Sequence, residues 1–182
     1  MATIYLVRHG RAASGWGLEK DPGLDELGRD QAKAAAQRLA PLGPLPIVAS
    51  PLKRARETSA PLAAIWQVEP VIEPRVGEIR FPAEAASDRV RWLKEVMAAQ
   101  WSDLGQNLRT WRQDVIEALH AITADCVIFS HFIAINVAVG FATADDRVVS
   151  FRPDNAAITI LETNGDGVNL LKQGDEADTS VN

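Results

Sequence analysis

The 182-residue sequence has a single cysteine, Cys126, which excludes an intramolecular disulfide and a cysteine-rich zinc site. Histidine is also scarce, because only His9, His120 and His131 occur. No HExxH spacing, P-loop or GxGxxG fingerprint is present. The sequence therefore predicts neither a metal site nor an organic cofactor.

Positive charge and long apolar runs are lacking as well. Lysine and arginine total 19 against 24 aspartate and glutamate residues, giving a formal net charge of -5. Such a balance argues against a surface that neutralises a nucleic-acid backbone or binds anionic lipid. The N-terminal sequence does not have the pattern of a signal peptide, and no stretch reaches the ~20 apolar residues that span a bilayer. We expect a cytoplasmic protein with neither a nucleic-acid nor a membrane partner, in which any anion site is local.

What is present is the composition of an ordinary globular domain, with 47% hydrophobic and 24% charged residues. A chain of this length predicts one domain with a buried core, over residues 1–173. The last residues, 174–182, are polar and acidic, and we expect a flexible C-terminal tail there.

Short apolar segments typical of buried strands alternate with helical patterns along the chain. The expected strands are residues 3–7, 47–49, 68–72 and 126–129, followed by a hairpin of residues 156–161 and 168–171. The expected helices are residues 24–40, 51–65, 87–101, 108–122 and 132–141. This alternation predicts an α/β fold, a three-layer α/β/α sandwich with a mostly parallel central sheet.

Residues at the ends of two helices support these boundaries. Asp25 is a good N-cap for the first helix, and Gly28 inside that helix indicates close packing. Ser50 and Pro51 form a favourable N-cap and N1 pair for the second helix.

Polar residues follow three of the expected strands directly. The first strand ends in Arg8-His9-Gly10, the second in Ser50 with Arg54 one helical turn later, and a late strand in Ser130-His131. The carboxyl ends of parallel strands meet at one edge of a sheet, so we expect these side chains together. Helix N-termini and arginines are donors for an anion, phosphate is the best-fitting anion, and Gly10 would let the backbone approach it closely.

Histidine is the remaining candidate nucleophile at such a site. Cys126 begins an apolar strand and does not lie in a loop that could cradle phosphate around a thiolate. A neutral imidazole can attack phosphorus and form a phosphohistidine that water later hydrolyses. Neighbouring arginines favour the neutral ring and stabilise charge on the phosphoryl oxygens.

Over roughly residues 3–161 the sequence resembles the histidine phosphatase, or phosphoglycerate-mutase-like, superfamily. Four motifs in the family's order carry this resemblance: Arg8-His9-Gly10, the run 50–58, Glu78 and Ser130-His131. The resemblance implies a metal-independent phosphatase in which His9 accepts the phosphoryl group, and Arg8, Arg54 and His131 hold the phosphate. It also implies Glu78 as the acid that protonates the leaving oxygen and then activates water. The family's S-x-x-x-R-A-x-x-T pattern selects Arg54 and not Arg56. The substrate would be a phosphorylated small molecule or phosphoprotein.

The sequence departs from the family pattern in three places. Phe132-Ile133 replaces the small residues after the second histidine, and either crowds the pocket mouth or fills the core. Residues 79–82 read Ile-Arg-Phe-Pro in place of a glycine- and tryptophan-containing run. The loop 11–23 lacks the Glu-Ser-x-Trp-Asn signature of true mutases. These departures weaken a mutase assignment and leave the phosphatase core intact. A phosphoglycerate-mutase-type phosphotransferase and a non-catalytic phosphate- or phosphoprotein-binding module stay open as alternatives to a phosphatase.

Other residues have competing structural interpretations. Arg11, Arg75 and Arg80 could touch the substrate, but we favour surface charge for them, and we expect structural roles for His120 and Cys126. Three tryptophans, Trp92, Trp101 and Trp111, have core spacing. Trp16 either borders the mouth of the site or packs at the surface.

Overall fold

The computed structural model describes residues 1–15, 19–82, 88–164 and 167–177 of the chain. In this part of the chain a central sheet has the strand order β3-β2-β4-β1-β5-β6. Its strands are β1 (Ala2–Arg8), β2 (Ile47–Ala49), β3 (Val71–Ile72), β4 (Cys126–Ser130), β5 (Ile158–Thr163) and β6 (Val168–Lys172). The pairs β1–β4, β2–β4 and β2–β3 are parallel, whereas β5 and β6 add an antiparallel hairpin beside β1.

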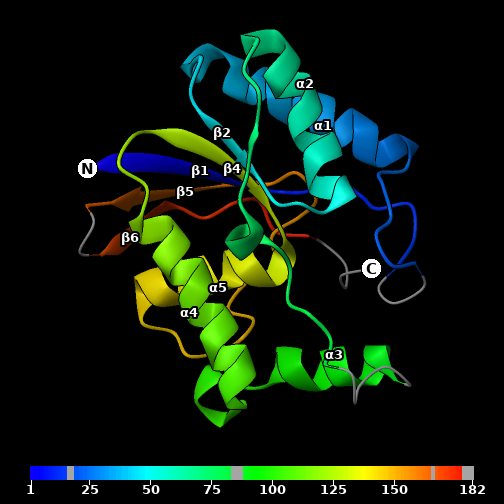
Figure 1. Cartoon of the computed structure of the whole chain (residues 1–182), viewed down its shortest axis with the longest axis vertical. Coiled ribbons are helices and arrows are strands. Elements are labelled where there is room, and N and C mark those ends of the chain that lie inside the picture. The colour runs from blue at the N-terminus through cyan, green and yellow to red at the C-terminus, as the bar shows by residue number, and fades with distance from the viewer. Residues whose placement is uncertain (16–18, 83–87, 165–166, 178–182) are drawn as a thin grey trace.

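Helices cover both faces of this sheet (Figure 1). They are α1 (Glu26–Leu39), α2 (Lys53–Trp66), α3 (Arg89–Ala98), α4 (Gln106–His120) and α5 (Phe132–Thr143). Helices α1 and α2 lie against one face and α4 and α5 against the other, with α3 beyond α4. The predicted α/β sandwich with a mostly parallel sheet is thus confirmed.

Side chains that alternate along each strand divide the hydrophobic core between the two faces of the sheet. Ile4 and Leu6 of β1 pack with residues of α4 and α5, whereas Val7 packs with residues of α1 and α2. The same alternation runs along β4, because successive side chains of a strand point to opposite faces. A further cluster joins α3, α4 and α5, which explains why α5 is buried on every side from Phe132 to Gly140.

The second helix begins later than the sequence predicts. Ser50 and Pro51 do not open it, since α2 starts at Lys53 and its N-cap residue Leu52 makes no side-chain cap bond. The carboxylate of Asp21 accepts hydrogen bonds from the Lys53 backbone N–H at 3.0 and 3.2 Å. A distant residue therefore satisfies this helix N-terminus, which frees the Ser50 hydroxyl for another contact.

Two other elements are shorter than expected. The strand β3 has only two residues, because it is the exposed edge of the sheet. Helix α3 ends at Ala98, and Trp101 begins the 3-10 turn η4 (Trp101–Asp103).

The C-terminal segment is paired further than predicted. Residues 174–177 lie beside residues 152–154, with Asp154 N–H donating to the Asp175 carbonyl at 2.8 Å and Ala177 N–H to the Arg152 carbonyl at 2.9 Å. The first four residues of the expected flexible tail are thus held by backbone hydrogen bonds. Residues 178–182 lie outside the described residues. Within the described ranges, no helix combines the length and the apolar character needed to cross a bilayer.

Two glycines let the loop after β1 press against α1. A Cβ atom at Gly28 would lie 2.1 Å from the Arg11 carbonyl oxygen, and one at Gly10 would lie 2.4 Å from the Gly28 carbonyl oxygen. Both distances are below any real contact, so this approach requires glycine on each side. The close packing predicted for Gly28 is confirmed, and Gly10 makes room for α1.

We expect Gly28→Ala to lower the free energy of unfolding by about 1–3 kcal/mol, measured by urea denaturation. At an exposed helix position the same substitution would raise the free energy of unfolding by about 1 kcal/mol, because alanine has the higher helix propensity. A decrease would therefore show that the steric clash outweighs the gain in propensity. The exposed Gln37→Ala in the same helix is the control, with an expected change within about 0.5 kcal/mol. A more stable Gly28→Ala protein would show that this contact is loose.

Candidate active site

Three strand ends bring the candidate residues to one edge of the sheet. Strand β4 lies between β1 and β2, with Arg8 opposite Ser130 and Ala49 opposite Phe129. Beyond these pairs, His9 N–H donates to the Ser130 carbonyl and Ser50 N–H to the Phe129 carbonyl, both at 3.0 Å. The polar residues that follow the strands therefore start from adjacent backbone positions.

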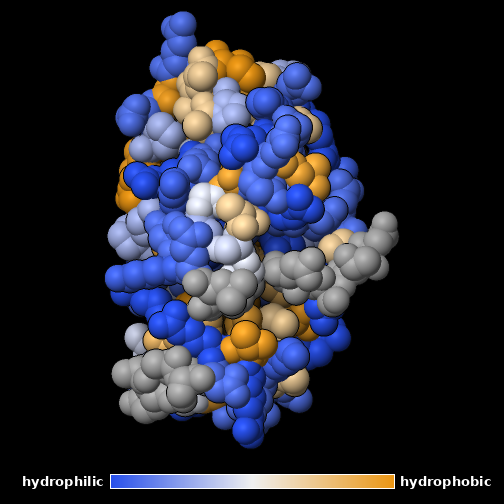
Figure 2. Space-filling view, turned by 90° about the vertical axis from the view of Figure 1, so that its right-hand side faces the viewer, coloured by the Kyte–Doolittle hydropathy of each residue, from blue (hydrophilic) through white to orange (hydrophobic). Residues whose placement is uncertain are grey.

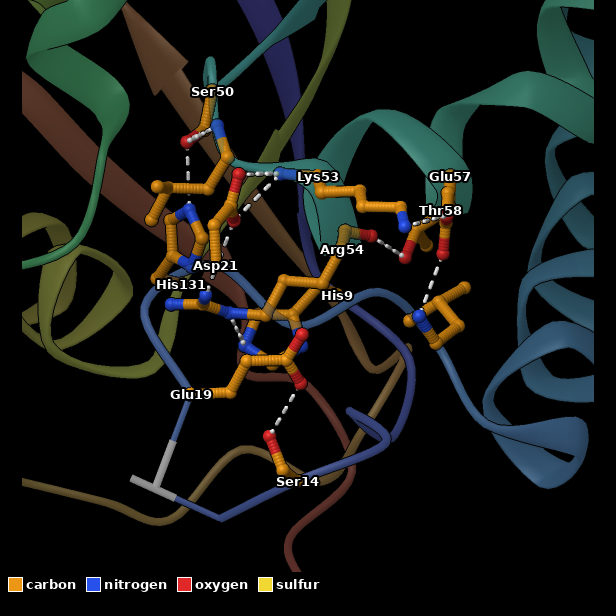
Figure 3. A network of polar contacts seen from close by, with 12 residues as sticks. His9, Ser14, Glu19, Asp21, Ser50, Lys53, Arg54, Glu57, Thr58 and His131 are labelled. Carbon is orange, nitrogen blue, oxygen red and sulfur yellow. Dashed lines mark hydrogen bonds and ion pairs between the residues drawn. The ribbon is translucent and has the colours of Figure 1, made fainter. Parts of the chain in front are cut away.

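The hydrogen bonds of the His9 imidazole determine which ring nitrogen carries the proton. Its Nδ1 lies 2.7 Å from the Gly10 carbonyl oxygen, which can only accept, so Nδ1 carries the proton. Its Nε2 accepts a hydrogen bond from Nε of Arg54 at 3.1 Å (Figure 3). The lone pair of Nε2 thus points toward a guanidinium group.

Thr58 fixes the relative positions of His9 and Arg54. Its hydroxyl accepts from Gly10 N–H at 2.9 Å and donates to the Arg54 carbonyl oxygen at 2.7 Å. Arg54 also lies 4.0 Å from the Asp21 carboxylate, the group that caps α2. The exposed Arg56 is not among the cleft residues, in agreement with the selection of Arg54 from the sequence pattern.

His131 is fully buried beside His9. The two ring centroids are 5.1 Å apart at an interplanar angle of 57°. Nε2 of His131 lies 2.7 Å from the Ser50 hydroxyl, and its Nδ1 has no hydrogen-bond partner among the described residues. The sheet therefore brings together two histidines that are 122 positions apart in the sequence.

Glu78 reaches the same place from the loop after the 3-10 turn η2 (Pro74–Val76). The Ser130 hydroxyl donates to the Val76 carbonyl at 2.7 Å and anchors this loop to the end of β4. The Glu78 carboxylate accepts from Ile79 N–H at 2.9 Å and from Ile133 N–H, in the first turn of α5, at 3.2 Å. Its side chain is buried at the cleft.

Arg8 is the most deeply buried charge of the group. It is 3% exposed, its guanidinium donates to the Pro153 carbonyl at 2.8 Å, and it lies 5.2 Å from the centre of the Phe132 ring. Its Nε has no partner among the described residues. Burial lowers the pKa of Arg8 to about 10, so the group is still a cation at neutral pH.

Burial and neighbouring charges set the protonation of the remaining groups. Burial lowers the pKa of His9 well below its usual value, and the Arg54 and Arg8 charges lower it further. Burial likewise lowers the pKa of His131, so both rings are neutral at pH 7. Burial raises the pKa of Glu78, which extends its protonated form toward neutral pH even though the backbone N–H groups and arginines oppose this.

A cleft of about 1010 Å³ opens above these groups. Arg8, His9, Arg54 and Glu78 line it, whereas His131 lies beside the His9 ring without lining the cleft and Gly10 faces α1. The side of the molecule at the right of Figure 1 is mostly hydrophilic with a hydrophobic area in its lower half (Figure 2). The cleft is much larger than a phosphate, which leaves space for the rest of a ligand.

Several cleft residues were not singled out from the sequence. Asp154 and Asn155 line the cleft, and the Asn155 amide donates to the His9 carbonyl at 3.2 Å. They come from an irregular segment before β5, where neither spacing nor hydropathy gives a signal. Ser50 and Thr58 do not line the cleft: Ser50 was among the polar residues predicted at this edge, and Thr58 entered only as part of the S-x-x-x-R-A-x-x-T pattern, without a role of its own.

The residues given structural interpretations divide into two groups. Arg11, Arg75 and Arg80 line the cleft, which favours the alternative that they touch a ligand, and Trp111 lines the cleft as well as packing against the core. Trp101 is buried in the core, as expected. Trp16 lies outside the described residues.

Burial agrees with the structural interpretation of the remaining polar candidates. His120 packs against the Phe141 ring, and burial raises the pKa of the Cys126 thiol to about 12. The uncertainty about Phe132-Ile133 is also resolved: both side chains are buried in the core cluster and neither lines the cleft.

A family model described as the histidine phosphatase superfamily (branch 1) matches residues 4–176. The chain is 31% identical over 110 residues to a protein of Photorhabdus laumondii named probable phosphoglycerate mutase GpmB, a match covering 53% of this chain and 50% of that protein. The chain spans about half the length of the curated relatives it matches.

Solved structures share the fold. YhfR of Bacillus stearothermophilus superposes with a TM-score of 0.77 at 21% identity, covering 97% of this chain and 98% of that one. A mycobacterial glucosyl-3-phosphoglycerate phosphatase, solved with VO3, superposes with a TM-score of 0.71 at 21% identity, covering 99% and 100%. At these identities the likeness establishes the architecture.

Because His131 is buried in its neutral form, we expect the free energy of unfolding to depend on pH. Below about pH 6.5 the unfolded chain protonates this ring while the folded protein does not, so the free energy of unfolding falls as pH falls, by up to about 1.4 kcal/mol per pH unit. We expect His131→Gln to lose less stability than the unsubstituted protein between pH 6.5 and 5, in urea titrations at each pH. Equal slopes would indicate a ring that is charged or solvated in the folded state.

Proposed function

Because the chain belongs to the histidine phosphatase superfamily, we propose that it hydrolyses phosphomonoesters through a phosphohistidine formed on His9. One observation carries this proposal: Nε2 of a neutral His9 directs its lone pair toward Arg54, at the floor of the cleft. A nucleophile for phosphorus needs that lone pair, and the Nδ1–H bond to Gly10 leaves it available.

In the first step, Nε2 of His9 attacks phosphorus and the bond from phosphorus to the ester oxygen breaks. Arg54 transfers its hydrogen bond from Nε2 to a phosphoryl oxygen, and Arg8 stabilises the same developing charge. Glu78 gives its proton to the leaving oxygen, so an alcohol departs. The raised pKa of Glu78 supports this role, because the donor must be protonated near neutral pH.

In the second step, the Glu78 carboxylate takes a proton from water as the water oxygen attacks phosphorus. The bond from phosphorus to Nε2 breaks, inorganic phosphate leaves, and Glu78 is protonated again. His9 returns to its neutral form, so the cycle balances without a metal ion or an organic cofactor.

The far end of the cleft would hold the leaving group of the substrate. Besides the four groups named above, the lining of the cleft includes Arg75, Arg80, Phe81, Arg89 and Trp111. We propose a phosphorylated small molecule or phosphoprotein of the cytoplasm as substrate. Glucosyl-3-phosphoglycerate phosphatase and a phosphoserine phosphatase share the fold, so phosphorylated metabolites belong in the first substrate panel.

A phosphoglycerate-mutase-type phosphotransferase is the second enzymatic candidate, favoured by curated relatives with that name. The loop 11–23 without the mutase signature opposes it. Labelled phosphate that passes from the protein to an alcohol in preference to water would establish the phosphotransferase.

A binding module without turnover is the third candidate. It would use the arginines and helix terminus to hold a phosphate without transferring it. Glu78 distinguishes it from an enzyme, because a binder has no need of a proton donor.

We expect a panel of phosphate esters to include substrates that are hydrolysed equally with and without EDTA. His9→Ala should lower kcat/KM by about 10³-fold or more, since the bond-forming atom is removed. His120→Ala, which changes the histidine at the end of α4, is the control and should stay within about twofold. Activity that EDTA abolishes, or that survives in His9→Ala, contradicts the mechanism.

We expect Glu78→Gln to lower kcat for an alkyl phosphate by about 10²- to 10⁴-fold. The first turnover of p-nitrophenyl phosphate should change far less, because nitrophenolate leaves without a proton. In the unsubstituted protein kcat/KM should fall as pH rises through the raised pKa of Glu78, and the variant should lack this fall. The exposed Glu69→Gln is the control. Unchanged kcat for the alkyl ester would remove Glu78 from the mechanism.

A further inference from the structure

The Ser50 hydroxyl is fully buried and makes two contacts. It accepts a hydrogen bond from Leu52 N–H at 3.2 Å, and it lies 2.7 Å from Nε2 of His131. Figure 3 shows Ser50 on one side of the His131 ring and Arg54 with His9 on the other. Ser50 therefore contacts His131 on the side of the ring opposite to His9 and Arg54.

The direction of the hydrogen bond between Ser50 and His131 follows from the available acceptors. A hydroxyl has one proton to donate, and in the described part of the chain Nε2 of His131 is its one acceptor within hydrogen-bond distance. If Nε2–H donated to Ser50 instead, the buried hydroxyl proton would be left without a partner, which is costly. If Nε2 accepts, the donor without a described partner is the Nδ1–H of His131, and a phosphoryl oxygen bound at the neighbouring His9 ring would accept from it. The Ser50 hydroxyl therefore donates to Nε2.

This direction determines the tautomer of His131. A neutral imidazole carries one proton, so a ring whose Nε2 accepts must carry it on Nδ1. That Nδ1 is buried, has no partner among the described residues, and belongs to a ring 5.1 Å from the His9 ring. A second buried donor without a described partner, Nε of Arg8, belongs to the same group of residues.

The two histidines thus offer opposite chemistry. His9 presents a lone pair at Nε2, held so by the Gly10 carbonyl, and His131 presents a proton at Nδ1, held so by the Ser50 hydroxyl. A phosphoryl group needs one electron-pair donor at phosphorus and hydrogen-bond donors at its oxygens. Two neutral rings supply both.

We infer that Ser50 is a positioning residue that keeps His131 as the Nδ1–H tautomer, so that the ring donates a hydrogen bond to a phosphoryl oxygen at His9. The inference rests on the proposed function for the identity of the ligand. The tautomer itself can be measured without any substrate.

Nitrogen-15 spectra of the labelled, unsubstituted protein test the tautomer directly. We expect the His131 ring to show a protonated Nδ1 and an unprotonated Nε2 at pH 7, with the signals assigned by their loss in His131→Gln. A protonated Nε2, or a doubly protonated ring, overturns the inference. If the His9→Ala test above succeeds while this result fails, only the role of Ser50 is wrong.

Kinetics of variants test the consequence. Ser50→Ala should lower kcat/KM by about 10- to 100-fold and weaken inhibition by inorganic phosphate, because the ring is no longer held as a donor. Ser50→Thr retains the hydroxyl and should recover most of the activity. Ser59→Ala removes a different buried hydroxyl, one within α2 that donates to the Arg56 carbonyl, and should leave kcat/KM unchanged.

The spectra keep the inference testable if either Ser50 variant folds poorly. In folded Ser50→Ala we expect the His131 tautomer to become mixed or reversed. A ring that stays fully Nδ1–H with normal activity in that variant would show that Ser50 does not position it.

Discussion

Parallel pairing of β4 between β1 and β2 is the constraint on which the site depends. It places the segments after three strands at adjacent positions, so that His9, Ser50 and His131 meet although 122 positions separate the first from the last. Alternation of side chains in these strands buries apolar residues beneath helices on both faces, and this packing fixes the register. The polar edge is thus a consequence of how the apolar faces are buried.

Burial at that edge determines the chemistry available to the polar groups. Desolvation keeps both imidazoles neutral and raises the pKa of the Glu78 carboxyl, while Arg8 and Arg54 keep their charge. Neutral histidines beside cationic arginines form a site for an anion and an attacking lone pair. The same burial makes each hydrogen bond important, because an unpaired polar group is costly in a dry environment.

The places where sequence reasoning failed share a physical cause. Ser50 has the type and position of an N-cap, yet Asp21, which is 32 positions before Lys53, reaches the N-terminus of α2 and leaves Ser50 for His131. Trp111 packs against the cluster of α3, α4 and α5 as its spacing predicts, but it also lines the cleft. Asn155 lies in an irregular segment without any local pattern. In each case a contact between distant segments decides what a local pattern leaves open.

The sequence by itself determined the alternation of strands and helices, the α/β class, and the candidate residues His9, Arg8, Arg54, Glu78 and His131. The fold class follows from hydropathy period and most of the candidate residues from motifs within short stretches of chain, which are local properties, whereas Glu78 follows from the resemblance to the histidine phosphatase superfamily. Tertiary structure alone decided which nitrogen of each histidine is protonated, which residues line the cleft, and which groups are dehydrated. Those properties depend on partners and burial that arise only when distant segments pack together.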